Sequence, residues 1–143
     1  AAAFLRRDGA DVTRVRKMFR RSMPDYKAKG EAVRHAEVFE DAFAIAVCPS
    51  EGVESPTIIG AQAANELLNI VGIKASVVLT RYQDTIYISA RSIDEVNVQL
   101  IMEKLGGGGH MSVAGAQLKD MTMDQAVAKV KETIRQMLDE GEI

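Results

Sequence analysis

The segment SARSIDEVNVQLIMEKLGGGGHMSVAG (residues 89–115) combines a strand end, an amphipathic helix and four consecutive glycines. Its helix is expected from Asp94, with the apolar side chains on one face. Gly106 follows at a position suited to end a helix. After His110, SVAG is expected to form one short helical turn and AQLK an edge strand. Strands and helices therefore alternate here, which is typical of an α/β domain.

The residues before this segment extend the same alternation. The stretches KASVVLTR (74–81) and TIYISAR (85–91) are rich in β-branched residues and flank the polar turn YQD, which predicts a hairpin. A helix, TIIGAQAANELLNIV (57–71), follows a Ser-Pro start and carries small residues that favour close packing on a sheet. FAIAVCP (43–49) is expected to be a buried strand. Long strand-helix-strand units imply at least one parallel pair of strands.

The two ends of the chain are predicted to be helical. Thr122 to Gln125 has the T-x-x-Q pattern of a capping box, which opens an amphipathic helix to about Leu138. Helices are also expected over 1–7, 11–22 and 24–36. The first begins without a capping residue or an initiator Met, so we expect a parent chain that continues upstream. The predicted fold is a mixed β-sheet flanked by helices and preceded by a helical connector, with domains at 1–36 and 37–143.

Composition restricts the class of protein. A length of 143 residues, with 47% apolar and 27% charged residues, fits one globular domain with its own core. No apolar run approaches the ~20 residues that span a bilayer. Cys48 is the single cysteine, so the chain forms no internal disulfide, and a reducing compartment is expected. One Cys and two His are also too few for a closed zinc site.

Charge is unevenly distributed along the chain. Residues 1–35 contain ten Lys or Arg and four Asp or Glu, a net charge of +6, whereas residues 36–143 contain eight and sixteen, a net charge of −8. A basic helix can meet phosphates or an anionic membrane surface. A solvated linker helix explains the same pattern without a ligand. The asymmetry thus marks a boundary more clearly than it marks a binding site.

The four glycines beside His110 indicate an anion site. Glycines allow positive φ and remove Cβ atoms from the path of a ligand, so successive N–H groups can converge on an anion. A helix N-terminus in the segment that follows would add further N–H donors. His110 and Arg91, at a strand end, would donate charge-assisted hydrogen bonds to phosphate. The candidate ligand-binding residues are Gly106, Gly107, Gly108, Gly109, His110, Arg91, Ser89, Ser92 and Asn97.

Each of these residues also has an explanation without a ligand. The glycines could be a helix cap and loop, His110 an ordinary surface or core histidine, and Arg91 an ion-pair partner of Asp94 or Glu95. His35 is expected to be incidental, Cys48 a core residue and the methionines packing residues. No complete catalytic constellation or metal-ligand cluster is evident, so we assign no catalytic residue and no metal ligand.

Residues 89–115 resemble the DHH-associated domain, the C-terminal substrate-binding half of DHH-superfamily phosphoesterases, which include RecJ-like nucleases and small oligoribonucleases. The wider stretch, from VFEDAFAIAVCPSEGVESPTIIGAQAANELL (38–68) through the glycine loop, looks closest to the membrane-anchored cyclic-di-AMP phosphodiesterases of Gram-positive bacteria. On that resemblance, residues 1–11 look like the last helix of a preceding DHH domain and 12–36 like a connector.

The resemblance implies a signalling hydrolase in which one domain carries out hydrolysis and another binds the substrate. A DHH domain, absent from this chain, would perform manganese-dependent hydrolysis, with no cofactor bound by this chain. The glycines from Gly106 to Gly109, His110, Arg91, Ser89 and Ser92 would bind the phosphate or nucleotide. The implied partners are a cyclic or linear dinucleotide, the upstream DHH domain and a second copy in a homodimer. The domain would be cytoplasmic, without direct membrane contact, in a membrane-anchored parent, and inactive alone.

Other functions stay open at the level of residues. Oligoribonuclease and RecJ-like exonuclease domains would share the glycine loop, as would the RNA-binding and self-association domain at the C-terminus of alanyl-tRNA synthetase. The acidic balance of residues 36–143 disfavours RNA, because RNA binders are usually basic. A module that binds a nucleotide or protein partner to regulate another protein is the remaining alternative.

Overall fold

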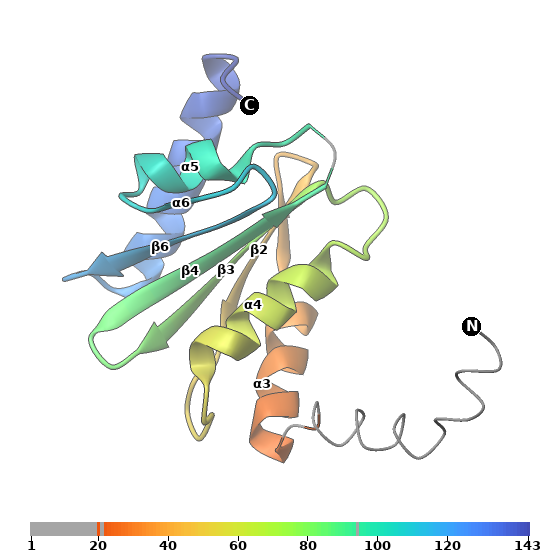
Figure 1. Ribbon diagram of the computed structural model, residues 1–143, viewed down its shortest axis with the longest axis vertical. Coiled ribbons are helices and arrows are strands. Elements are labelled where there is room, and N and C mark those ends of the chain that lie inside the picture. The colour runs from red at the N-terminus through yellow and green to blue at the C-terminus, as the bar shows by residue number, and fades with distance from the viewer. Residues whose placement is uncertain (1–19, 21, 94) are drawn as a thin grey trace, which may run out of the picture.

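The computed structural model describes residues 20, 22–93 and 95–143. Its centre is a six-stranded sheet with the strand order β1-β2-β3-β4-β6-β5 (Figure 1). Strands β2 and β3 are parallel and all other neighbours are antiparallel, so the expected mixed sheet with a parallel pair is confirmed. The strands are β1 (Glu37–Phe39), β2 (Phe43–Cys48), β3 (Ala75–Tyr82), β4 (Thr85–Ser92), β5 (Gly108–Gly109) and β6 (Val113–Lys119).

One face of the sheet is covered by α5 (Val98–Lys104) and α6 (Met123–Asp139). The capping box at the start of α6 is confirmed, because Thr122 and Gln125 each bond the other's backbone N–H through their side chains. Ala126, Val130 and Ile134 of α6 are fully buried. They complete a core with the inward side chains of all the long strands.

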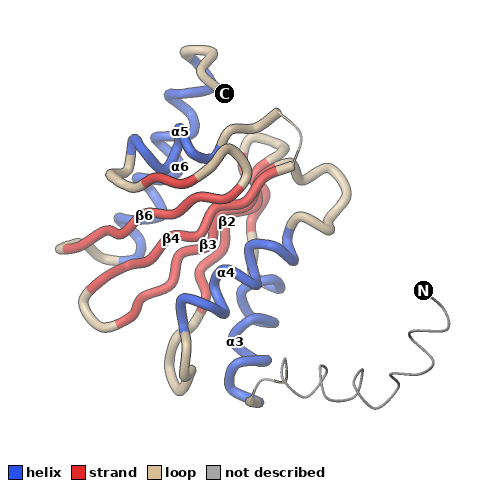
Figure 2. Tube along the Cα trace, viewed as in Figure 1, coloured by secondary structure: helices blue, strands red, loops and turns tan. Residues whose placement is uncertain are grey.

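The opposite face is covered over β2 and β3 by α3 (Met23–Arg34) and α4 (Pro56–Leu67), as Figure 2 shows. Small side chains let α4 lie very close to β3. A Cβ added at Gly60 would lie 2.4 Å from Thr80 Oγ1, and Ala63 and Ala64 are fully buried. Ser76 Oγ donates a 2.6 Å hydrogen bond to the Ala64 carbonyl oxygen. The close packing predicted for this helix is therefore confirmed.

Several local predictions were wrong around the glycines. SVAG is not a helical turn: its residues 113–115 begin β6, which lies between β4 and β5 and is not an edge strand. The helix expected from Asp94 begins at Val98. Gly108 and Gly109, expected in a loop, form the short edge strand β5. The predictions for 1–19, including the helix over 1–7, lie outside the described residues, and the domain boundary at residue 36 stays a prediction.

Candidate ligand site at the glycine strand

The α4 side of the sheet stays accessible beyond β3. In Figure 1, α3 and α4 lie on the β2 and β3 side of the sheet, and α4 also contacts β4, whereas β6 lies beyond both helices. On this open half, Tyr87, Ser89 and Arg91 alternate with the buried residues of β4. Val113 of β6 is 46% exposed on the same face. The residues of the open half are therefore partly accessible, and packing in the hydrophobic core does not account for their side chains.

Two neighbouring rows of residues cross this open half. In the first, Ser89 lies opposite Gly115, and Gly115 lies opposite Gly108. In the second, Arg91 lies opposite Val113. His110 extends this second row, because its N–H donates a 2.7 Å hydrogen bond to the Val113 carbonyl oxygen.

Directly opposed residues in a sheet share a face, so the two rows lie side by side on the open half. Gly108 and Gly115 form a patch of bare backbone, which we call the glycine shelf. At about 4.8 Å per strand, Arg91 and His110 stand roughly 10 Å apart along the edge of the shelf.

The glycines of the run differ in the reason for lacking a side chain. A Cβ at Gly107 would lie 2.1 Å from the Gly115 carbonyl oxygen, and one at Gly109 would lie 2.5 Å from that of Val113. Gly106 has a φ of 86° after α5, as its predicted role in ending the helix requires. A Cβ at Gly108 would meet nothing within 4 Å. Packing and backbone conformation therefore explain three glycines, and Gly108 is the exception.

Most N–H groups of the run are used within the fold. Gly106 donates to the Glu103 carbonyl oxygen, Gly107 to that of Met102 and His110 to that of Val113. The successive N–H groups of the run therefore do not all converge on one point, as the sequence had suggested. In an antiparallel pair the N–H groups point alternately toward and away from the partner, so that of Gly109 points away from β6. A helix N-terminus after His110 is also absent, since β6 follows.

Arg91 lies at the C-terminal end of β4, as predicted. Its Nη1 donates hydrogen bonds to the carbonyl oxygens of Ala90, at 2.9 Å, and Ala114, at 3.5 Å. These bonds hold the half-buried guanidinium against the sheet. Burial lowers the pKa of Arg91 from its usual value. The expected ion-pair alternative is not observed with Glu95, which pairs with Lys74 at 3.1 Å.

Two predicted ligand residues do not lie on the open half. Ser92 is buried, and its Oγ donates to the Met111 carbonyl oxygen at 3.3 Å. Asn97 caps α5, its Oδ1 accepting the Leu100 N–H at 3.3 Å. Both residues position the glycine strand, but the structure does not bring them to the shelf with Ser89, Arg91 and His110.

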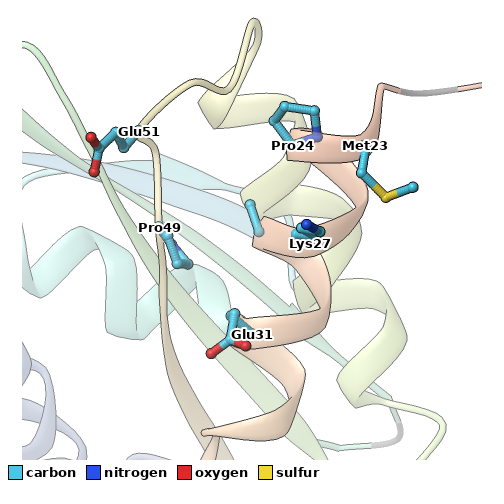
Figure 3. Close-up of a pocket in the computed structure, with 7 residues that line it drawn as sticks. Met23, Pro24, Lys27, Glu31, Pro49 and Glu51 are labelled. Atoms are coloured by element: carbon cyan, nitrogen blue, oxygen red, sulfur yellow. The ribbon is translucent and has the colours of Figure 1, made fainter.

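A separate cavity of about 500 Å³ lies at the other edge of the sheet. Figure 3 shows that α3 forms one side, with Met23, Pro24 and Lys27, and that the segment after β2 forms the other, with Pro49 and Glu51. Its lining is mainly apolar, and its charged residues are two glutamates, Glu31 and Glu51, and one lysine, Lys27. Among the described residues that line it, Lys27 is the single cation, and a phosphate site needs several convergent donors.

Within residues 20, 22–93 and 95–143, no group of three or more His, Cys, Asp and Glu side chains could hold a metal ion. Over the same residues, no helix combines the length and apolarity needed to cross a bilayer. Sequence reasoning missed Gly115, Val113 and Tyr87 as members of the open half. Their strand register, which the sequence does not reveal, is what places them there.

Comparison with known proteins agrees with this fold. The chain is 41% identical over 142 residues to the cyclic-di-AMP phosphodiesterase GdpP of Geobacillus thermodenitrificans, covering 99% of the chain and 21% of the relative. It is 43% identical over 127 residues to the cyclic-di-AMP phosphodiesterase PdeA of Listeria monocytogenes, covering 88% and 19%. The chain thus spans about a fifth of the length of these relatives.

The structure also resembles the crystal structure of an exopolyphosphatase-related protein from Bacteroides fragilis. The TM-score is 0.71 at 21% identity, over 82% of this chain and 36% of the other. This likeness concerns the fold alone. The DHHA1 domain family model matches residues 41–139, which confirms the predicted resemblance. The chain therefore belongs to the DHHA1 domain family of DHH-associated domains.

Proposed function

We propose that this chain is the substrate-binding part of a cyclic-dinucleotide phosphodiesterase, and that a phosphate of the substrate lies on the glycine shelf between Arg91 and His110. The observation that carries the proposal is Gly108, which lacks a side chain although a Cβ there would meet no atom of the described residues within 4 Å. Without that Cβ, bare backbone lies beside the row of Arg91, Val113 and His110, whose two donor side chains can reach a ligand placed on it.

The chemistry of the flanking residues suits a phosphodiester. Arg91 is a permanent cation, and its half-buried position strengthens its attraction for an anion. His110 is exposed and can donate a hydrogen bond through its imidazole in either protonation state. Ser89, opposite Gly115, adds a hydroxyl on the same row. These groups bind and orient a phosphate, but they do not activate a water molecule.

Hydrolysis is therefore assigned to another part of the parent protein. Two relatives at 41% and 43% identity are named as cyclic-di-AMP phosphodiesterases. In this proposal an upstream DHH domain, ending near residue 36, holds manganese and supplies the attacking water. The chain alone is then inactive, and membrane anchoring belongs to other parts of the parent. Residues 37–143 neutralise and position the substrate.

Calorimetric titration of the chain with cyclic-di-AMP and its linear dinucleotide product tests the binding. We expect specific binding that Arg91→Ala, His110→Ala and Gly108→Val each weaken about tenfold or more, because each loses or blocks a phosphate contact. Arg135→Ala, His35→Ala and Gly30→Val are matched controls on α6, at the end of α3 and within α3, and should bind as the wild type does.

Equal binding by the Arg91 and Gly108 variants and their controls would overturn the phosphate site. A preference for RNA over both dinucleotides would favour the alternative of an RNA-binding module. Turnover of cyclic-di-AMP by the purified chain with manganese would contradict the assignment of hydrolysis to another domain.

A further inference from the structure

A second cavity opens on the same sheet face, at the far end of β4 from Arg91. It has a volume of about 300 Å³ and lies between the first turn of α4 and the end of the β3–β4 hairpin. Tyr82 and Tyr87 line it from the hairpin, and Pro56 and Ile58 line it from the helix. We call it the tyrosine cavity.

The two tyrosines form an accessible aromatic surface. Their ring centroids are 6.4 Å apart and the ring planes are inclined by 53°. Tyr82 is 42% exposed and Tyr87 is half-buried, so neither residue is fully packed in the hydrophobic core. The chain has only three tyrosines and no tryptophan, and two of its three large amphipathic rings meet here. Aromatic side chains of this kind stack on nucleobases.

The cavity lies on the same strand as the proposed phosphate contacts. Tyr87, Ser89 and Arg91 occupy alternate positions of β4 and share a face. At about 3.3 Å per residue, the Cα atoms of Tyr87 and Arg91 are roughly 13 Å apart. A free phosphate is too small to contact both Tyr87 and Arg91. In a dinucleotide, the sugar-phosphate backbone joins a base, which can lie at Tyr87, to a phosphate that can lie at Arg91.

The polar lining suits the edge of a base. Ser55 caps α4 through its backbone and makes no capping hydrogen bond with its hydroxyl. Glu54 lines the cavity beside it and supplies a carboxylate that can accept from an exocyclic amine. The volume is at the low end of the roughly 300–1,000 Å³ of small-molecule pockets, so it fits one base and not a whole dinucleotide.

We propose that the tyrosine cavity binds one nucleobase of the dinucleotide whose phosphate lies on the glycine shelf, with the base stacked on Tyr87 and Tyr82. This proposal rests on the function proposed above for the shelf. In this proposal the spacing along β4 fixes the distance between the two subsites: Arg91 binds the phosphate near one end of the strand, and Tyr87 binds the base toward the other.

The test compares three ligands: linear diadenosine dinucleotide, its analogue with one adenine removed, and adenosine. Because the chain has no tryptophan, tyrosine emission reports binding directly, with calorimetry for affinity. We expect wild type to bind the dinucleotide roughly 5- to 150-fold more tightly than the abasic analogue, since stacking stabilises each bound base by about 1–3 kcal/mol. Tyr87→Leu should abolish this preference without changing affinity for the abasic analogue.

Three variants control for folding and for the ring. Tyr87→Phe should keep the preference, because it keeps the stacking ring. Tyr26→Leu, on exposed α3, should leave both affinities unchanged. Tyr82→Leu should reduce the preference partly.

The possible results separate the two proposals. Equal affinity for dinucleotide and abasic analogue in the wild type, or a preference that survives Tyr87→Leu, would overturn the base site. Tyr87-dependent binding of adenosine, with no effect of Arg91→Ala on any ligand, would support the base site and reject the phosphate shelf. If none of the three ligands binds, both proposals fail.

Discussion

The two halves of the α4 side of the sheet use small residues for opposite purposes. On the covered half, Gly60 brings α4 against β3 so closely that a Cβ would lie 2.4 Å from Thr80 Oγ1. On the open half, Gly108 lies where a Cβ would meet nothing within 4 Å. The role of a glycine can therefore be read only when its neighbours are known. At Gly60 the missing side chain allows close packing, whereas at Gly108 it leaves a surface bare.

The largest effect is expected for Gly107→Ala, which places a methyl group 2.1 Å from the Gly115 carbonyl oxygen. Because backbone cannot move aside as a flexible side chain does, we expect the free energy of unfolding to fall by about 2–4 kcal/mol. Urea denaturation measures this loss. A variant as stable as the wild type would show that β5 and β6 do not pack as closely as described.

Gly60→Ala should cost less, about 1–2 kcal/mol. The new methyl group meets the Thr80 hydroxyl, but alanine also improves helix propensity by about 1 kcal/mol. In a Thr80→Ala background the collision partner is gone, so the same substitution should cost less or nothing. A double-mutant cycle by thermal unfolding checks this, and full additivity would disprove the contact.

The burial of Cys48 on the covered half predicts a dependence of stability on pH. Burial raises the pKa of its thiol from 9.0 to about 11, the hydrogen bond with Thr80 opposing this. The folded state thus holds its proton more tightly than the unfolded state. This contribution to stability is complete below about pH 9 and declines as pH rises toward 11. Cys48→Ala should show a flatter decline between pH 9 and 11 in urea denaturation, and an identical slope would exclude this thiol as the cause.

Gly108→Ala should have the smallest effect on stability. Its Cβ enters open space, and alanine restricts the unfolded chain more than glycine does, so the change should be within about 0.5 kcal/mol and in the stabilising direction. Affinity for the dinucleotides should nevertheless fall. Gly30→Ala, at another position with an open Cβ, is the matched control for both measurements. Reduced stability without reduced affinity would give Gly108 a packing role instead.

The site was only partly predictable because its residues belong to separate strands. Glycines before a histidine and an arginine at a strand end were visible as local signals, and the structure brings Arg91 and His110 onto one row with Val113. Gly115 carried no such signal, since its meaning comes from pairing with Ser89 and Gly108. Asn97 shows the opposite difficulty: the structure makes it the cap of α5, and a capping asparagine and a ligand asparagine look alike until the helix start is known.

What the sequence by itself determined was local chemistry: the hairpin of β3 and β4, the Thr122–Gln125 capping box and the family resemblance each depend on residues close together in the chain. Only the tertiary structure decided that Gly108 and Gly109 form a strand, that SVAG extends beside β4, and that part of one sheet face stays open. The physical reason is that two glycines have no intrinsic strand preference. They become a strand because β6 offers hydrogen-bonding partners, and the approach is so close at Gly109 that a Cβ there would lie 2.5 Å from the Val113 carbonyl oxygen.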